Sequence, residues 1–169
     1  LVWSEAVPRW ADGLEPEAVR AAVRAHLERT VRRYRTTVDA WDVVHNPNGA
    51  THLGRAEIAA AEALAWADAA DPAGALLVTA DDPASLTAAA GADNGDDADD
   101  RRPDAVGVTA HQHEGAWSLG RLREAVGTAA RAGRPVSVSA VTILGDTETE
   151  AEQAEAVRHF YTAALADRR

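Results

Sequence analysis

Residues 38–47 contain the pattern that most constrains the fold, because they read as a buried strand. The run is apolar and rich in valine, contains Trp41, and ends in the polar pair His45 and Asn46 before Pro47. Such apolar runs are typical of parallel strands that are covered on both faces. In a (β/α)8 barrel, the reactive groups lie where such strands end, at the C-terminal face. Neither residue at this tip is a carboxylate, which limits the chemistry that the tip can perform.

Four further strand patterns alternate with helix patterns along the chain. Strands are expected at residues 1–3, 75–79, 105–111 and 135–141, and helices at residues 16–35, 55–70, 119–132 and from about 150 onward. The alternation predicts an α/β fold with about five parallel strands, because parallel strands need helical crossovers. A complete (β/α)8 barrel usually needs about 250 residues. We therefore expect a single domain over residues 1–169 that forms a partial TIM barrel.

Several expectations concern single helices and loops. The apolar face of the helix at 55–70 would consist of Ile58, Ala61, Leu64 and Ala65, and that of the last helix of Ala154, Val157, Tyr161, Ala164 and Leu165. Thr147 and Glu150 have the spacing of a capping box. Residues 91–104 are dense in aspartate and glycine, which predicts a mobile acidic loop.

The composition excludes several classes of function. Lysine and arginine number 17 against 27 aspartate and glutamate residues, giving a formal net charge of −10, which argues against a general binder of nucleic-acid phosphates. The sequence has no cysteine and therefore no disulfide or thiol chemistry. No apolar run approaches the ~20 residues of a membrane span, so no membrane partner is expected. Because Leu1 already belongs to a strand-like segment and no signal peptide precedes it, we expect a fragment or a mature piece.

Five segments resemble glycoside hydrolase family 10, the endo-β-1,4-xylanases. Residues 41–44 read Trp-Asp-Val-Val and are followed by Pro47, as in the family's fourth-strand motif Trp-Asp-Val-Val-Asn-Glu-Pro. Residues 1–10 resemble the third strand, with Leu-Val-Trp followed by Pro and Trp, and residues 105–111 resemble the sixth strand, with an Ala-His-x-His motif that continues into the next loop. Residues 75–81 and 135–141 resemble the fifth and seventh strands. The resemblance covers family strands three to seven, so it implies a barrel that lacks strands one, two and eight.

The resemblance also implies roles for individual positions. Asn46 stands where the family has its acid/base glutamate, and Ala140 stands where the family has its nucleophilic glutamate. The positions that would contact sugar are Ser4, His45, Asp81, Thr109, His111 and Trp117. Xylan or xylo-oligosaccharide is the implied partner, and secretion is the implied localisation.

The two catalytic positions decide the predicted function. A retaining glycosidase uses two carboxyl groups about 5–5.5 Å apart, one as acid/base and one as nucleophile. Asn46 cannot donate a proton as a carboxylic acid does, and Ala140 offers no nucleophile, so most transition-state stabilisation should be lost. We predict a carbohydrate-associated domain without hydrolytic activity. Two alternatives remain: a xylanase-type hydrolase that uses other acids near the strand tips (Glu5, Asp81, Asp82 or Glu114), or a structural or assembly domain with no glycan role.

Other polar and aromatic residues allow further readings. His45, His111 and His113 fall at strand tips near Asp81 in barrel order, and such clusters can hold a divalent ion. We favour inherited sugar contacts, and we expect no metal and no cofactor. Five parallel strands leave two open sheet edges, which predicts self-association through those edges.

Four tryptophans and one aspartate, within or just after the strands, carry their own expectations. Trp3 and Trp41 lie within strands and are expected in the core, whereas Trp10 and Trp117 lie in loops and either stack on sugar or pack on their own loop. Asp42 lies inside a strand, where it is expected to pair with an arginine or to cap a neighbouring backbone.

Overall fold

The computed structural model describes residues 1–3, 7–47, 50–53, 56–81, 85, 102–112, 119–131, 133–143 and 149–166. It describes the backbone alone at residues 50–53, 110–112, 119, 121–122, 140 and 142–143. Most of the acidic loop expected at 91–104 lies outside the described residues, and so does Thr147 of the expected capping box.

Five strands form one parallel sheet in the order β1-β2-β5-β6-β7. The strands of the chain are β1 (Val2–Trp3), β2 (Ala40–His45), β3 (Ala50–Leu53), β4 (Ala56–Ala59), β5 (Ala75–Ala80), β6 (Ala105–Gln112) and β7 (Val136–Ile143). The helices are the short 3-10 helix η2 (Arg9–Ala11) and the α-helices α1 (Pro16–Tyr34), α2 (Ala60–Ala70), α4 (Leu119–Ala130) and α5 (Glu150–Ala166). The predicted alternation of parallel strands with helices is therefore confirmed.

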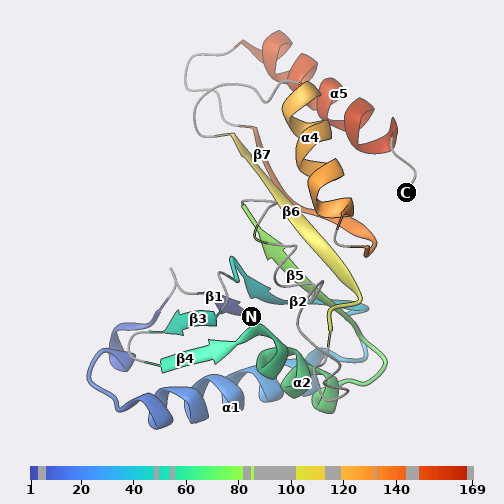
Figure 1. Ribbon diagram of the computed structural model, residues 1–169. Coiled ribbons are helices and arrows are strands. Elements are labelled where there is room, and N and C mark those ends of the chain that lie inside the picture. The colour runs from blue at the N-terminus through green and yellow to red at the C-terminus, as the bar shows by residue number, and fades with distance from the viewer. Residues whose placement is uncertain are drawn as a thin grey trace.

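The helices divide into two pairs at the two ends of the sheet. Figure 1 shows α1 and α2 together at the end that carries β1 and β2, and α4 and α5 together beside β6 and β7. Within the described residues, β1 pairs only with β2 and β7 only with β6, so these two strands are the edges of the sheet. None of the helices in the described residues is long and apolar enough to cross a membrane.

A single buried cluster, called the main core below, extends from β1 to β6 and includes residues of α1, α2 and α4. Its fully buried large side chains include Leu27, Leu64, Leu76, Val43, Val78 and Val106. Many of its other members are alanines, so the core is built largely from small side chains.

Trp41 is buried in the main core, as the sequence predicts, and its position depends on two neighbours. Its Nε1–H donates to Asp71 Oδ2 at 2.9 Å, and Asp71 is itself only 5% exposed. A Cβ at Gly74 would lie 2.8 Å from Trp41 Nε1, so glycine is needed where the chain turns from α2 into β5. The buried Trp41 N–H thus has Asp71 as its acceptor, and the absence of a side chain at Gly74 leaves room for the indole.

The helix expected at 55–70 is wrong in its first part, because residues 50–53 and 56–59 pair as an antiparallel hairpin, β3–β4. In β4 the burial alternates, with Ala56 and Ile58 buried and Glu57 exposed, which is the period of a strand. The alanine-rich sequence hides this short alternation within a strong helix signal. Arg20 of α1 ties the hairpin to the helices, since it donates to the Glu57 carbonyl at 2.8 Å and pairs with Glu62.

The apolar face predicted for α5 is also wrong, except at Ala164. Phe160 and Ala163 are its buried residues, packed with Val126, Val138 and Ala164. Val157, Tyr161 and Leu165 are instead 39%, 57% and 71% exposed. The helix carries two apolar stripes, and the neighbouring elements α4 and β7 cover the one that contains the phenylalanine.

Candidate functional site

A bulge in β2 creates the polar site at the end of the strand. One extra residue, Val43, is inserted between Asp42 and Val44 where β2 pairs with β5. Residues three apart in a regular strand point to opposite faces, but here Asp42 and His45 contact the same side chain, that of Thr79. The bulge therefore brings an acid and an imidazole to one shared hydroxyl.

Asp42 is the carboxylate at one end of this contact chain. Thr79 Oγ1–H donates to it, with oxygen–oxygen distances of 2.9 Å to Oδ2 and 3.1 Å to Oδ1. The side chain keeps contact with solvent, yet surrounding protein atoms remove part of its hydration, and this desolvation raises its pKa. The hydrogen bond from Thr79 and the charges of the Leu1 amino group and His45 oppose the rise. The partner of Asp42 is thus a threonine hydroxyl rather than the arginine or backbone group that was expected.

His45 links Thr79 to Asp81. Its Nδ1 lies 2.8 Å from Thr79 Oγ1, and its Nε2 lies 3.6 Å from Asp81 Oδ1. Trp3, its register partner in β1, meets the imidazole edge-on, with ring centroids 5.2 Å apart and an interplanar angle of 87°. Trp3 is 42% exposed, so its expected place in the core is wrong. Its place on an edge strand leaves part of the indole uncovered.

Asn46 both donates a hydrogen bond to Asp81 and accepts one from it. Its Nδ2–H donates to Asp81 Oδ2 at 2.9 Å, and the Asp81 backbone N–H donates to Asn46 Oδ1 at 2.8 Å. Asn46 has a φ of 53°, a left-handed conformation that asparagine adopts more readily than most residues. Its own N–H donates to the Thr79 carbonyl at 2.8 Å. A glutamate side chain at this position would have no amide N–H to give to Asp81.

Asp81 collects donors from two neighbouring strands. Thr109, which is 3% exposed, donates its hydroxyl to Asp81 Oδ1 and lies 3.5 Å from the Ala80 carbonyl oxygen. The Asp81 side chain is nevertheless 50% exposed. Four positions that the sequence predicted for the site, His45, Asn46, Asp81 and Thr109, therefore lie together where β2, β5 and β6 end.

Four other predicted positions are not placed in this network. Ala140 lies in β7 opposite Thr109, and His111 lies further along β6; only their backbone is described. Ser4 and Trp117 lie outside the described residues. The roles assigned to these four positions remain predictions.

The alternative of a metal site has two described members, His45 and Asp81, which face each other as described above. Within the described part of the chain, no three histidine or acidic side chains are grouped so that they could hold a metal ion. His113 is outside that part, and the His111 side chain is not described.

Thr79 and Gly107 are the residues that sequence reasoning missed. Thr79 is fully buried and shared by two partners. A Cβ on Gly107 would collide with Thr79 Cγ2 and Ser139 Oγ, so glycine in β6 lets the threonine keep its place. A hydroxyl within an apolar run and a glycine inside the next strand were the available signals.

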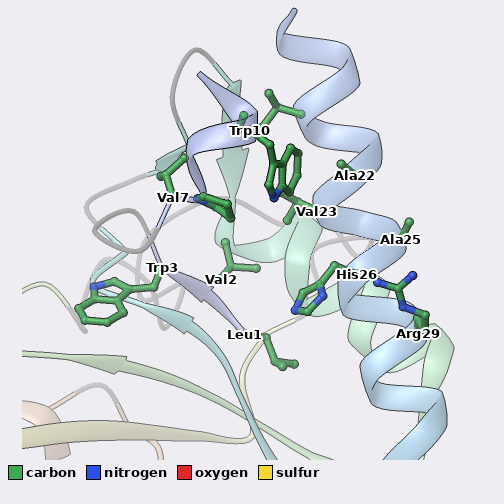
Figure 2. A pocket seen from close by; sticks show the side chains of 13 residues that line it. Leu1, Val2, Trp3, Val7, Trp10, Ala22, Val23, Ala25, His26 and Arg29 are labelled. Carbon is green, nitrogen blue, oxygen red and sulfur yellow. The ribbon is translucent and has the colours of Figure 1, made fainter. Parts of the chain in front are cut away.

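An apolar pocket of about 780 Å³ lies beside β1 and is separate from the polar network. It is lined by the N-terminal segment and one side of α1, with His26 and Arg29 as its polar members. Figure 2 shows Trp10, Val23 and His26 grouped around it, whereas the ring of Trp3 points away from them. Its described lining contains no carboxylate, so the chemistry expected of a glycosidase has no support there.

The sequence of residues 1–78 matches the family model of glycosyl hydrolase family 10. A comparison with curated proteins finds no match. The chain's resemblance to this family, predicted from the motifs above, is thus supported most directly in the half that contains β1, β2 and β5.

Solved xylanase structures match nearly the whole chain. Xylanase 10B from Thermotoga maritima is 17% identical with a TM-score of 0.74, and the match covers 98% of this chain and 57% of that enzyme. Xylanase XynB from Paenibacillus barcinonensis is 18% identical with a TM-score of 0.69, and the match covers 98% of this chain and 58% of that enzyme. The family 10 xylanase from Thermobacillus composti is 21% identical with a TM-score of 0.67, and the match covers 98% of this chain and 56% of that enzyme.

The chain thus spans less than 60% of the length of these three enzymes. At these identities the likeness concerns the fold, and it confirms the predicted partial (β/α)8 barrel. Together with the sequence match over residues 1–78, it confirms the resemblance to glycoside hydrolase family 10.

Proposed function

We propose that this chain is a carbohydrate-associated domain of the glycoside hydrolase family 10 type that binds xylo-oligosaccharide at its strand ends without hydrolysing it. The observation that carries the proposal is the environment of Asn46. This residue holds the position of the family's acid/base glutamate, and its amide is bonded in both directions to Asp81.

The absence of hydrolysis follows from the chemistry of the remaining groups. Neither Asn46 nor Ala140 is a carboxylic acid, although the retaining mechanism needs a pair of carboxyl groups about 5–5.5 Å apart. Asp81 accepts from Thr109 on one oxygen and from Asn46 on the other, so these two side chains fix the orientation of its carboxylate. Loss of acid/base catalysis alone typically costs about 10²–10⁴-fold in rate.

A glycan ligand is supported by the groups that the strand ends present. Asp81 is half exposed and can accept hydroxyl protons, and His45 lies directly beside it. Trp3 offers a partly uncovered indole at the neighbouring strand end, which suits the apolar face of a sugar ring. The structures of similar fold are xylanases, which makes xylo-oligosaccharide the first ligand to test.

Calorimetry with xylohexaose, combined with a reducing-sugar assay, tests both halves of the proposal. We expect saturable binding and no product above a buffer blank. Asp81→Ala should weaken binding by about tenfold or more, as for a lost hydrogen bond to a charged group. Asp39→Ala is the matched control, because this exposed aspartate precedes β2 at the opposite end of the strand.

The remaining outcomes select between the alternatives. Product well above the blank would show an active hydrolase that uses other acids, and would contradict the proposal. No saturable binding at millimolar xylohexaose would remove the glycan role and favour a structural or assembly domain.

A further inference from the structure

A continuous series of polar contacts runs from the middle of β2 to the end of β5. It passes from Asp42 Oδ2 to Thr79 Oγ1 (2.9 Å), from Thr79 Oγ1 to His45 Nδ1 (2.8 Å), and from His45 Nε2 to Asp81 Oδ1 (3.6 Å). We propose that these four side chains form a proton-transfer site, in which Asp42 and His45 share one proton through Thr79 and His45 presents it at the strand end beside Asp81. The proposal goes beyond the proposed function, because it assigns proton transfer to these residues whether or not a glycan binds.

The proton count follows from the single hydrogen of the threonine hydroxyl. In one arrangement Asp42 is ionised, Thr79 donates to it, and His45 is an imidazolium whose Nδ1–H donates to Thr79 and whose Nε2–H faces Asp81. In the other arrangement Asp42 is protonated and donates to Thr79, Thr79 donates to Nδ1 of a neutral His45, and Nε2–H still faces Asp81. In both arrangements the donors between Asp42, Thr79 and His45 Nδ1 have acceptors, and Nε2–H lies 3.6 Å from Asp81 Oδ1.

The two arrangements contain the same number of protons. Asp42, Thr79 and His45 carry none, one and two protons in the first, and one each in the second. The Asp42 O–H bond breaks as a new O–H bond forms on Thr79, and the original Thr79 O–H bond breaks as the Nδ1–H bond forms on His45. A neutral acid and a neutral imidazole thereby become a carboxylate and an imidazolium, and no electron or co-reactant is needed.

The surroundings of Asp42 act on its protonation in opposite directions. Partial loss of hydration favours the protonated form of Asp42, whereas the amino group of Leu1, which donates to the Asp42 backbone carbonyl at 2.7 Å, favours the ionised form. At the other end of the series, Asp81 Oδ1 lies 3.6 Å from His45 Nε2, and the rings of Trp3 and His45 meet at 87°. Among the described residues, the Leu1 amino group, just before β1, and Asp81, just after β5, are the charged groups beside Asp42 and His45.

The backbone holds the series in place. The β2 bulge turns Asp42 and His45 toward one hydroxyl, and Gly107 leaves the space that the methyl group of Thr79 occupies. Thr79 is fully buried, so its hydroxyl has little freedom to rotate toward water. A preorganised hydroxyl between an acid and a base is the geometry that proton transfer requires.

Thr79→Val and Thr79→Ser form a matched pair of tests. Valine keeps the shape of the side chain without the hydroxyl, whereas serine keeps the hydroxyl. The measurement is a pH titration by NMR of the Asp42 ¹³Cγ signal and the two His45 ring ¹⁵N signals in the full chain without ligand. We expect the Asp42 titration to reappear as a step in the His45 nitrogen signals of the wild type and of Thr79→Ser, as for coupled sites, and to vanish from them in Thr79→Val.

Two results would overturn the proposal: wild-type His45 signals that show no step at the Asp42 titration, or a step that persists unchanged in Thr79→Val. If Thr79→Val does not fold, Asp42→Asn provides the same test, because it must abolish that step while His45 still titrates. Since no glycan is present, failure of xylohexaose binding leaves this result intact, and a negative titration leaves the glycan proposal intact.

Discussion

The two ends of the sheet differ in how well they are covered. At the end formed by β1, β2 and β5, α1 and α2 contribute many of the residues of the main core. At the β7 end, α5 buries Phe160 and Ala163 and leaves Val157, Tyr161 and Leu165 exposed. The family match over residues 1–78 falls on the well-covered end. The polar site, formed where β2, β5 and β6 end, lies mainly at the end that carries the family match.

The largest expected effect on stability comes from replacing a buried large side chain by alanine, once at each end of the sheet. Leu76→Ala, at a fully buried position in β5, should lower the free energy of unfolding by about 2–5 kcal/mol, because it removes a large core side chain and leaves a cavity. Phe160→Ala should cost less, because among the described residues its buried cluster is small, and it should release α5 before the rest unfolds. Urea unfolding followed by tryptophan fluorescence, with hydrogen exchange for α5, measures both. Equal losses in one shared transition would erase the contrast between the ends.

An intermediate effect is expected at Asp71, which lies at the well-covered end. Asp71→Ala would leave the buried Trp41 N–H without its acceptor and should cost about 1–3 kcal/mol of stability. Asp71→Asn keeps a carbonyl oxygen of the same size and serves as the control, with a smaller expected loss. Thermal and urea unfolding of the two variants provide the comparison. If both lose the same stability, the hydrogen bond to Trp41 contributes little.

The smallest effect concerns the start of α5, where Thr149 and Glu152 form a capping box. The Thr149 N–H donates to Glu152 Oε2 at 2.7 Å, and the Glu152 N–H lies 3.4 Å from Thr149 Oγ1. Thr149→Ala should destabilise α5 by about 1 kcal/mol, visible as faster amide exchange confined to this helix, with Thr149→Ser as the control. A uniform change across the chain would mean that α5 is as firmly attached as the other helices.

The same cap has a pH dependence with a defined sign. The hydrogen bonds from the Thr149 backbone and hydroxyl lower the pKa of Glu152. Its contribution is therefore present above the ordinary glutamate range and is lost as pH falls through the lowered pKa. The difference between wild type and Thr149→Ala should shrink in acid, and a difference that grows there would contradict the capping role.

Secondary structure that depends on residues close together in the chain was predicted well. The strands around Trp41 and Leu76 and the helix that opens at Pro16 follow from local apolar patterns. The hairpin β3–β4 was missed because a four-residue alternation is weaker than the helix preference of the surrounding alanines. The capping box was placed two residues too early, since Thr149 and Glu152 have the same spacing as the pair that was chosen.

For the site, the sequence supplied the identities of His45, Asn46, Asp81 and Thr109, which the structure brings together; the catalytic position assigned to Asn46 stays a prediction. The sequence could not supply their partners, because a one-residue bulge in β2 changes which side chains share a face and leaves no clear mark in the pattern.

Local periodicity and motif spacing were thus enough to specify the class of fold and the order of its elements, since each depends on residues near one another in the chain. Packing between distant segments alone decided that Thr79 joins Asp42 to His45, that Asn46 holds Asp81, and that one stripe of α5 is buried and the other left exposed. These contacts depend on register and on what covers each face, and both arise only when separate strands and helices meet.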